Sequence, residues 1–217
     1  MKDAECMQAL GFFGGTFNPV HYGHLRAALE FHYAFDLQRT ALLPCRPAHR
    51  AMPDVSDSQR LTMLRLAVQD SAILTVDTRE LDSDALSYTL DTLTVLRREV
   101  GADVALYFAL GSDAFNDIES WHDWQALFDV ANLVVLHRPG VPILLEHPFL
   151  QAKKCVFSGI HQTHGGLYEL AVSALDVSST QIRALCRRHQ ALDYLVPSNV
   201  AAFIAMEKLY CDDDVES

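Results

Sequence analysis

Short apolar segments alternate with segments of helical character along most of this chain, and this alternation restricts the possible folds more than any other feature of the sequence. The expected strands cover residues 9–13, 39–44, 72–77, 104–110, 132–137 and 167–172. The expected helices cover residues 22–35, 58–68, 88–99, 179–189 and 198–209. Strands separated by helices form parallel sheets, because each helix carries the chain back to the edge where the previous strand began. The sequence therefore predicts an open α/β fold.

Length and charge limit the possible partners. The chain has 217 residues, enough to bury a sizeable core in one domain, which we expect over 1–210 with an acidic, partly disordered tail over 211–217. Its formal net charge of -11 repels nucleic acid and anionic membranes. We therefore expect neither as a partner, and a small anionic ligand needs a local positive site. The state of assembly stays open between a monomer and a small homo-oligomer.

The cysteines and the N-terminus indicate a reducing compartment. No two of the five cysteines form a C-x-x-C pair, which argues against a disulfide framework or a thiolate zinc site; they are Cys6, Cys45, Cys155, Cys186 and Cys211. The first ten residues lack the apolar centre of a secretory signal, and no apolar run reaches the roughly 18 residues of a membrane span. We expect a cytoplasmic protein.

The region over 139–166 is the hardest to interpret, because prolines, glycines and histidines cluster there. We expect an irregular excursion from the fold. Within it, His161 and His164 have a spacing that would suit a metal on a helix, but Gly165 and Gly166 follow directly. A solvated loop is the favoured interpretation.

The segment 11–24, GFFGGTFNPVHYGH, carries the first chemical signal. Gly14 and Gly15 follow the first expected strand, and a helix is expected to begin near Tyr22. Ligands of open α/β sheets bind beyond the carboxyl ends of the strands, where glycines let backbone N–H groups approach a phosphate. The chain contains neither G-x-G-x-x-G nor G-x-x-x-x-G-K-[ST], so neither the dinucleotide nor the Walker fingerprint applies.

His21 and His24 straddle the expected start of that helix. A donating or protonated imidazole there suits negative charge that develops on a phosphate oxygen. Two alternatives stay open on the residues alone. In one, His24 caps the helix while His21 packs against Pro19; in the other, the two rings belong to a zinc site, although no further ligand is obvious.

The segment 176–189, DVSSTQIRALCRRH, carries the second signal. Ser178, Ser179 and Thr180 precede a helical run, and Arg183 follows one turn on. Hydroxyls and free N–H groups at a helix start, with a guanidinium nearby, can hold a polyphosphate. The alternative is an ordinary N-cap followed by an exposed arginine.

Together the two segments make a specific resemblance. G-G-T-F-[DN]-P-x-H-x-G-H followed by [IV]-S-S-T-x-[IL]-R resembles the nucleotidyltransferase superfamily, and within it the bacterial nicotinate-nucleotide adenylyltransferases. The similarity continues through LLPCRPAHR, SYTLDTL, ALGSDAF, VVLHRPG and YLVPSNVAAFI. It implies a Rossmann-like open parallel sheet with helices on both faces, and adenylyl transfer from ATP to the 5′-phosphate of nicotinate mononucleotide.

The resemblance also assigns residues to the ATP site. His21, His24 and Arg183 would be catalytic, and Mg²⁺ would be held mainly by the ATP phosphates, with no metal ligand expected from the protein. The residues expected to line the ATP site are Gly14, Gly15, Thr16, Phe17, His21, His24, Gly111, Asp113, Ser178, Ser179, Thr180 and Arg183. For Asp113 the residues alone would favour a helix N-cap after a strand.

On the acceptor side, the resemblance implies contacts from His49, Arg50, Ser87, Tyr88, Thr89 and Trp121. An indole face suits the flat, electron-poor pyridine ring. On sequence alone Trp121 could equally serve packing, and packing is the favoured role of Trp124.

Two positions depart from the family pattern. Asn18 stands where an aspartate is frequent, and Ala48 stands where a second proline is usual. The first puts a carboxylate role in doubt, and the second could loosen the loop that presents His49. Rival interpretations are the same chemistry on nicotinamide mononucleotide, on 4′-phosphopantetheine or on a cytidylyltransferase substrate, and a catalytically silent nucleotide sensor.

Overall fold

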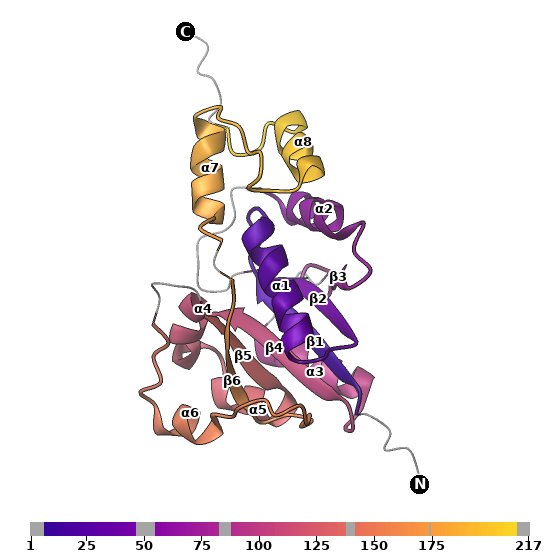
Figure 1. The fold of residues 1–217 in the computed structure, drawn as a ribbon, viewed down its shortest axis with the longest axis vertical. Helices are drawn as coiled ribbons and strands as arrows, with labels where there is room; N and C mark the ends of the chain where they lie inside the picture. Colours follow the sequence, from indigo (N-terminus) through magenta and orange to yellow (C-terminus); the bar gives the residue numbers. More distant parts are fainter. Residues whose placement is uncertain (1–6, 47–54, 83–87, 138–141, 174, 212–217) are drawn as a thin grey trace.

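A computed structural model describes residues 7–46, 55–82, 88–137, 142–173 and 175–211. Its centre is a six-stranded parallel sheet in the order β3-β2-β1-β4-β5-β6 (Figure 1). The strands are β1 (Ala9–Gly15), β2 (Arg39–Pro44), β3 (Leu74–Val76), β4 (Ala105–Gly111), β5 (Asn132–His137) and β6 (Leu167–Ala171). All six strands expected from the sequence are confirmed, as is the open α/β fold.

Five helices agree with the expected ones to within three residues at either end. They are α1 (Tyr22–Ala34), α2 (Asp57–Val68), α3 (Thr89–Val100), α7 (Ser179–Arg187) and α8 (Ser198–Met206). Five short helical segments were not expected: α4 (Ser112–Asn116), the 3₁₀ turns η1 (Ile118–Ser120) and η2 (Trp124–Ala126), α5 (Leu127–Val130) and α6 (Pro148–Lys153). Segments of three to six residues are too short to show a helical period in a sequence.

Helices cover both faces of the sheet, and two apolar clusters separate them from the strands. Along β4, Tyr107 and Ala109 belong to one cluster, whereas Leu106 and Phe108 belong to the other. This alternation follows from the two-residue period of a strand. The first cluster includes side chains of α1, α2, α7 and α8, and the second includes side chains of α3, α4, α5 and α6.

The expected irregular excursion over 139–166 is only partly irregular, because α6 lies within it. The loop after α6 is anchored to the sheet by the buried side chain of Asn132, which donates to the carbonyl of Gln162 at 2.7 Å. Arg97 of α3 donates to the carbonyl of Thr163 at 2.6 Å. Both anchors hold loop carbonyls, and the carbonyl of Thr163 also accepts from the N–H of Leu106 in β4 at 3.1 Å.

His161 and His164 lie in this loop and outside any helix, as favoured from the sequence. The Nδ1 of His161 lies 3.2 Å from the hydroxyl of Tyr107, and the Nδ1 of His164 lies 3.2 Å from the carbonyl oxygen of Phe128. The two rings therefore make separate contacts, and neither belongs to a group of three His, Cys, Asp or Glu side chains among the described residues.

The strand order fixes the position of a site. β1 lies between β2 and β4, so the connections after β1 and after β4 leave the sheet in opposite directions. A crevice opens at such a switch point, beyond the carboxyl ends of the two strands. In Figure 1, α2, α7 and α8 lie together at one end of the molecule.

Within the described part of the chain, no helix has the length and apolar character needed to span a membrane.

Candidate active site

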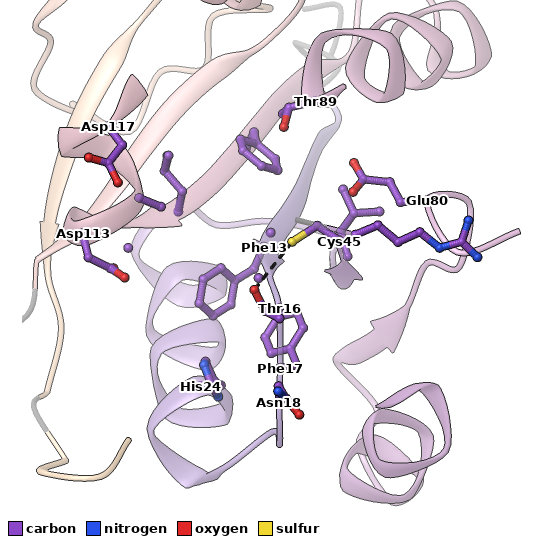
Figure 2. A pocket seen from close by; sticks show the side chains of 18 of the residues that line it. Phe13, Thr16, Phe17, Asn18, His24, Cys45, Glu80, Thr89, Asp113 and Asp117 are labelled. Atoms are coloured by element: carbon purple, nitrogen blue, oxygen red, sulfur yellow. Dashed lines mark hydrogen bonds between the residues drawn. The ribbon is translucent and has the colours of Figure 1, made fainter. Parts of the chain in front are cut away.

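A cleft of about 620 Å³ occupies the switch point, and described residues from both sequence motifs line it. In Figure 2, Asp113 and Asp117 project from one side, Glu80 and Cys45 lie on the other, and His24 lies below Phe13 and Phe17. Every described residue expected at the site belongs to the lining: Gly14, Gly15, Thr16, Phe17, His21, His24, Tyr88, Thr89, Gly111, Asp113, Trp121, Ser178, Ser179, Thr180 and Arg183. Three expected residues, His49, Arg50 and Ser87, lie outside the described residues.

The loop between β1 and α1 passes close to its neighbours. A Cβ atom on Gly14 would lie 2.6 Å from the ring of Phe108, so only glycine fits the end of β1 here. Phe17 has a φ of 48°, in the left-handed region that bulky residues rarely adopt. Its ring is buried and meets the ring of Phe13 edge to face, with centroids 5.8 Å apart. Packing therefore holds the loop in a conformation that the backbone alone disfavours.

His21 and His24 lie together at the start of α1. His21 is the N-cap residue, and its side chain makes no capping hydrogen bond, while His24 lies in the first turn. The alternative in which His24 caps the helix is therefore wrong. The two rings stack with centroids 3.7 Å apart and planes 28° apart, and both side chains are largely buried while lining the cleft.

The start of α7 brings the second motif to the same cleft. Ser178 is the N-cap, and its hydroxyl oxygen accepts a hydrogen bond from the backbone N–H of Gln181 at 3.1 Å. The capping role left open by the sequence is therefore real for Ser178. The hydroxyl of Ser179 donates to the carbonyl of Pro19 at 2.8 Å, which ties the helix start to the β1–α1 loop.

Arg183 makes a second tie between α7 and that loop. Its Nη1 donates to the carbonyl of Asn18 at 2.8 Å, and its Nη2 donates to the hydroxyl of Thr180 at 3.3 Å. Arg183 is therefore not the exposed arginine of the alternative interpretation, because it is half-buried and lines the cleft. A guanidinium held in this way keeps its fork in a fixed geometry, which favours planar recognition of phosphate oxygens.

Two helix N-termini therefore face the cleft, and both favour an anion. The N-terminus of an α-helix carries a partial positive charge and unpaired N–H groups. The first turns of α1 and α7, whose residues the structure describes throughout, contain no Asp or Glu. This arrangement supplies the local positive site that a chain of charge -11 requires for an anionic ligand.

Gly111 and Asp113 lie at the end of β4 and line the same cleft as the start of α7. Gly111 is the N-cap of α4, and Asp113 lies in the first turn of that helix with an exposed side chain. Asp113 is therefore not the N-cap that the residues alone would favour. A carboxylate at this position can accept hydrogen bonds from sugar hydroxyls.

Aromatic side chains gather in the part of the cleft near the start of α3. Tyr88, the N-cap residue of α3, lies against the ring of His122 with centroids 4.5 Å apart. Trp121 is half-buried and lines the same wall. Trp124 does not line the cleft; it packs edge to face on Phe149 at 5.4 Å, in agreement with the packing role favoured for it.

Of the two positions that depart from the family pattern, Asn18 lies within the described residues. The amide oxygen of Asn18 accepts a hydrogen bond from the hydroxyl of Tyr210 at 2.8 Å, so this position is held by a neutral pair. A carboxylate is not needed to orient this contact. Ala48 lies outside the described residues.

Several lining residues were not expected from the sequence, among them Cys45, Arg46, Glu80, Asp117 and His122. Glu80 is buried, and burial raises its pKa to about 7, with a further rise from the charge of Asp77. Burial also raises the pKa of the Cys45 thiol to about 11, so this cysteine stays protonated at neutral pH. In the sequence, each of these residues resembles an ordinary loop residue.

Among the described residues, no three His, Cys, Asp or Glu side chains come together as a metal site would require. His21 and His24 thus have no third ligand of these types within that part of the chain.

Comparisons with known proteins agree with this geometry. The family model described as cytidylyltransferase-like matches residues 12–185. A protein of Cellvibrio japonicus named probable nicotinate-nucleotide adenylyltransferase is 43% identical over 93% of this chain and 98% of its own length. A Pseudomonas putida protein of the same name is 40% identical, with 97% of this chain and 98% of that protein covered.

A solved structure shows the same fold. It is that of Plasmodium falciparum nicotinic acid mononucleotide adenylyltransferase complexed with NaAD, with a TM-score of 0.70 and 18% sequence identity. The match covers 94% of this chain and 97% of that one. The Rossmann-like nucleotidyltransferase fold expected from the sequence is therefore confirmed.

Proposed function

The chain belongs to the cytidylyltransferase-like family, and from this premise we propose that it transfers the adenylyl group of ATP to the 5′-phosphate of nicotinate mononucleotide. The products are nicotinate adenine dinucleotide, or deamido-NAD, and pyrophosphate, a step of NAD biosynthesis. Curated relatives named for this activity are about 40% identical to the chain over more than nine tenths of its length.

One observation carries the assignment of the phosphate chemistry. The two motifs, about 160 residues apart in the chain, meet where Arg183 donates to the carbonyl of Asn18 at 2.8 Å. With the N-termini of α1 and α7 on the same cleft, this contact supports a site for a polyphosphate.

The reaction needs no nucleophile from the protein. The acceptor phosphate is already an anion, and its oxygen attacks the α-phosphorus of ATP in line with the departing pyrophosphate. The P–O bond to the bridging oxygen breaks as the new P–O bond forms. Catalysis then rests on positioning and on stabilisation of charge. The protonated thiol of Cys45 in the cleft is consistent with a mechanism without a covalent enzyme intermediate.

We assign the stabilisation of charge to His21, His24 and Arg183. The imidazoles lie at the start of α1, where donors and the helix dipole act on the same oxygen atoms. Ser179 and Thr180 belong to the first turn of α7, whose N–H groups we assign to the β- and γ-phosphates. Asp113 and Gly111 are assigned to the ribose side of the nucleotide.

We propose that Mg²⁺ enters the cleft on the ATP phosphates. The donor set fits an ion carried by the nucleotide, because no three candidate protein ligands converge within the described residues. When bound, the ion would offset charge on the departing pyrophosphate. The protein's own share is to orient the triphosphate through Arg183 and the two helix N-termini.

The acceptor is assigned to the aromatic part of the cleft. The indole of Trp121 and the ring of Tyr88 offer faces for the pyridine, and the first turn of α3, which begins at Thr89, offers backbone N–H donors for a carboxylate. His49, Arg50 and Ser87 stay predicted acceptor contacts outside the described residues. A carboxylate accepts stronger hydrogen bonds from such donors than a carboxamide does, which favours nicotinate over nicotinamide mononucleotide.

Pyrophosphate release with ATP and magnesium tests this function. The purified protein is given nicotinate mononucleotide, nicotinamide mononucleotide or 4′-phosphopantetheine as the acceptor, with an acceptor-free control. We expect strong preference for the first. Activity with only one of the other acceptors would support the phosphate chemistry but contradict the assignment of nicotinate mononucleotide as the acceptor. ATP binding without turnover on any acceptor would instead support a nucleotide sensor.

The cytoplasmic location and the monomer or small homo-oligomer expected from the sequence stay predictions of the same proposal. Sedimentation of the purified protein tests the second.

A further inference from the structure

We propose that Arg60 is a positioning residue for adenylyl transfer. It clamps the β1–α1 loop to the segment after β2, and so holds the Thr16–Phe17 peptide in the orientation in which it meets the triphosphate. The identity of the ligand rests on the proposed function, but the clamp itself rests only on contacts within the protein.

The local sequence puts Arg60 where the clamp needs it. α2 begins with a capping box, in which the Ser56 hydroxyl accepts from the N–H of Gln59 and the Gln59 side chain accepts from the N–H of Ser56. This fixes the first turn, which carries Asp57 three positions before Arg60. Side chains at this spacing lie on one face of a helix and can pair.

The Arg60 side chain is fully buried, and its contacts join separate loops. Its Nη1 donates to the carbonyl of Thr16 at 2.6 Å and to the carbonyl of Cys45 at 3.0 Å. Its Nη2 donates to Asp57 Oδ1 at 2.5 Å. A buried guanidinium is costly unless it is paired and hydrogen-bonded. Here a carboxylate and two carbonyls pair its Nη1 and Nη2, while its buried Nε has no hydrogen-bond partner among the described residues.

Asp57 extends the network to a cleft residue. Its Oδ2 accepts from Arg46 Nε at 2.5 Å, and Arg46 Nη2 donates to the carbonyl of Leu81 at 3.0 Å. Burial alone would raise the pKa of Asp57, but its hydrogen bonds with Arg60 and Arg46 outweigh this and lower the pKa. The carboxylate therefore stays charged at neutral pH and holds both guanidinium groups. Arg46 itself lines the cleft.

The orientation of one peptide unit follows from the first contact. The Thr16–Phe17 bond is trans, since the cis bond of the described chain is Asn18–Pro19. In a trans peptide the C=O and the N–H point in opposite directions. Because the Thr16 carbonyl points to Arg60, the N–H of Phe17 points away from Arg60.

The same unit precedes the strained φ of 48° at Phe17. A conformation of this kind persists only where the surroundings over-determine it. The buried Phe17 ring supplies one restraint, and the Arg60–Thr16 bond supplies the other. Arg60 does not line the cleft, so its effect on the reaction passes through the loop.

Hydrogen exchange separates a clamp from a general contribution to stability. The N–H of Cys45 donates to the carbonyl of Gly15 at 3.0 Å, directly beside the clamp. In Arg60→Met we expect this amide to exchange about tenfold faster relative to the amides of β4, measured by NMR on the ligand-free protein. A purely structural role would accelerate both by the same factor, and that result would overturn the proposal.

Kinetics supply the second readout. With Arg60→Met we expect kcat to fall about 100-fold, because a small misplacement of a reacting group is costly. We expect the Kd of ATP to change by less than about tenfold, because the α7 contacts remain. Arg60→Lys keeps one nitrogen for the two carbonyls and should recover part of kcat. The matched control Arg65→Met removes an exposed guanidinium from the same helix and should behave as the wild type.

If Arg60→Met does not fold, Arg60→Lys carries the same two comparisons, with about a tenfold loss of kcat expected. Wild-type kcat in that variant would overturn the proposal. If the wild-type protein shows no adenylyl transfer at all, the proposed function fails, and the exchange rates of Cys45 and β4 judge the clamp by themselves.

Discussion

The imidazole rings of His21 and His24 stack with centroids 3.7 Å apart at the N-terminus of α1. His24 also meets the ring of Phe17 edge to face, with centroids 5.0 Å apart. The strained loop and the two histidines therefore form one packed unit. A substitution of Phe17, His21 or His24 alters the packing of the rings that remain. The first two histidines of the sequence thus mark the start of α1 and one wall of the cleft.

Replacement of His24 by alanine tests the role assigned to this unit. We expect kcat of His24→Ala to fall roughly 100- to 1,000-fold, the loss typical of removing a donor that stabilises developing charge. Alanine is a good helix former, so α1 should persist and the far-UV circular dichroism should match the wild type.

The control is His189→Asn, which changes an exposed histidine with a φ of 50° to a residue that tolerates that conformation. It should keep full activity. Near wild-type kcat in a folded His24→Ala protein would remove His24 from the mechanism.

Arg183 should not be replaceable by lysine. Its two terminal nitrogens already contact Asn18 and Thr180, and a single ammonium cannot reproduce that fork while also meeting a phosphate. We expect Arg183→Lys to lower kcat/KM for ATP about 10- to 100-fold. Arg188→Lys, at an exposed position just after α7, is the matched control and should change neither constant.

The raised pKa of Glu80 predicts a pH dependence of stability. The carboxyl has a pKa of about 7 in the folded protein against 4.5 for the free group, so the folded state holds the proton more tightly. Its contribution is fully present below pH 4.5 and is lost as the pH rises through 7. The loss is on the order of 3 kcal/mol at most.

Urea unfolding of Glu80→Gln at pH 5, 6, 7 and 8 measures this contribution. The wild type should lose more stability over that range than the variant, because the amide cannot ionise. Glu119→Gln removes an exposed carboxyl and should leave the wild-type pH profile intact. Parallel profiles for all three proteins would show that Glu80 does not titrate in this range.

The two tryptophans allow the acceptor wall to be observed directly. Trp121 lines the cleft, whereas Trp124 packs against His147 and Phe149 outside it. Stacking of a pyridine on an indole should quench its fluorescence. We expect nicotinate mononucleotide to quench the fluorescence of the Trp124→Phe variant, which retains Trp121. The fluorescence of the Trp121→Phe variant should stay unchanged. The reverse pattern would move the acceptor away from Trp121.

Much of this architecture could be predicted because strong local patterns carried it. The strand VALYFAL is apolar on both faces, and the glycines at 14 and 15 mark the end of β1. Such runs identify a buried parallel strand without tertiary information. α4, α5 and α6 escaped prediction because each has at most six residues.

The support of the site could not be predicted in the same way. Arg60 in SDSQRLTM resembles an ordinary surface arginine of a helix, and Glu80 in TRELDSD resembles a solvated charge. Their burial depends on where α2 and the segment after β3 pack against the sheet, which is a tertiary property. The packing likewise decides which hydroxyl caps α7 and which contacts the β1–α1 loop; Ser178 does the first and Ser179 the second.

The most direct test of the central claim is a competition. The purified protein is given ATP, magnesium and equal concentrations of nicotinate and nicotinamide mononucleotides, and the two dinucleotide products are quantified by mass spectrometry over the first few per cent of turnover. Their ratio equals the ratio of kcat/KM for the two acceptors. We expect nicotinate adenine dinucleotide to predominate by at least about tenfold. Equal products, or an excess of the nicotinamide dinucleotide, would contradict it.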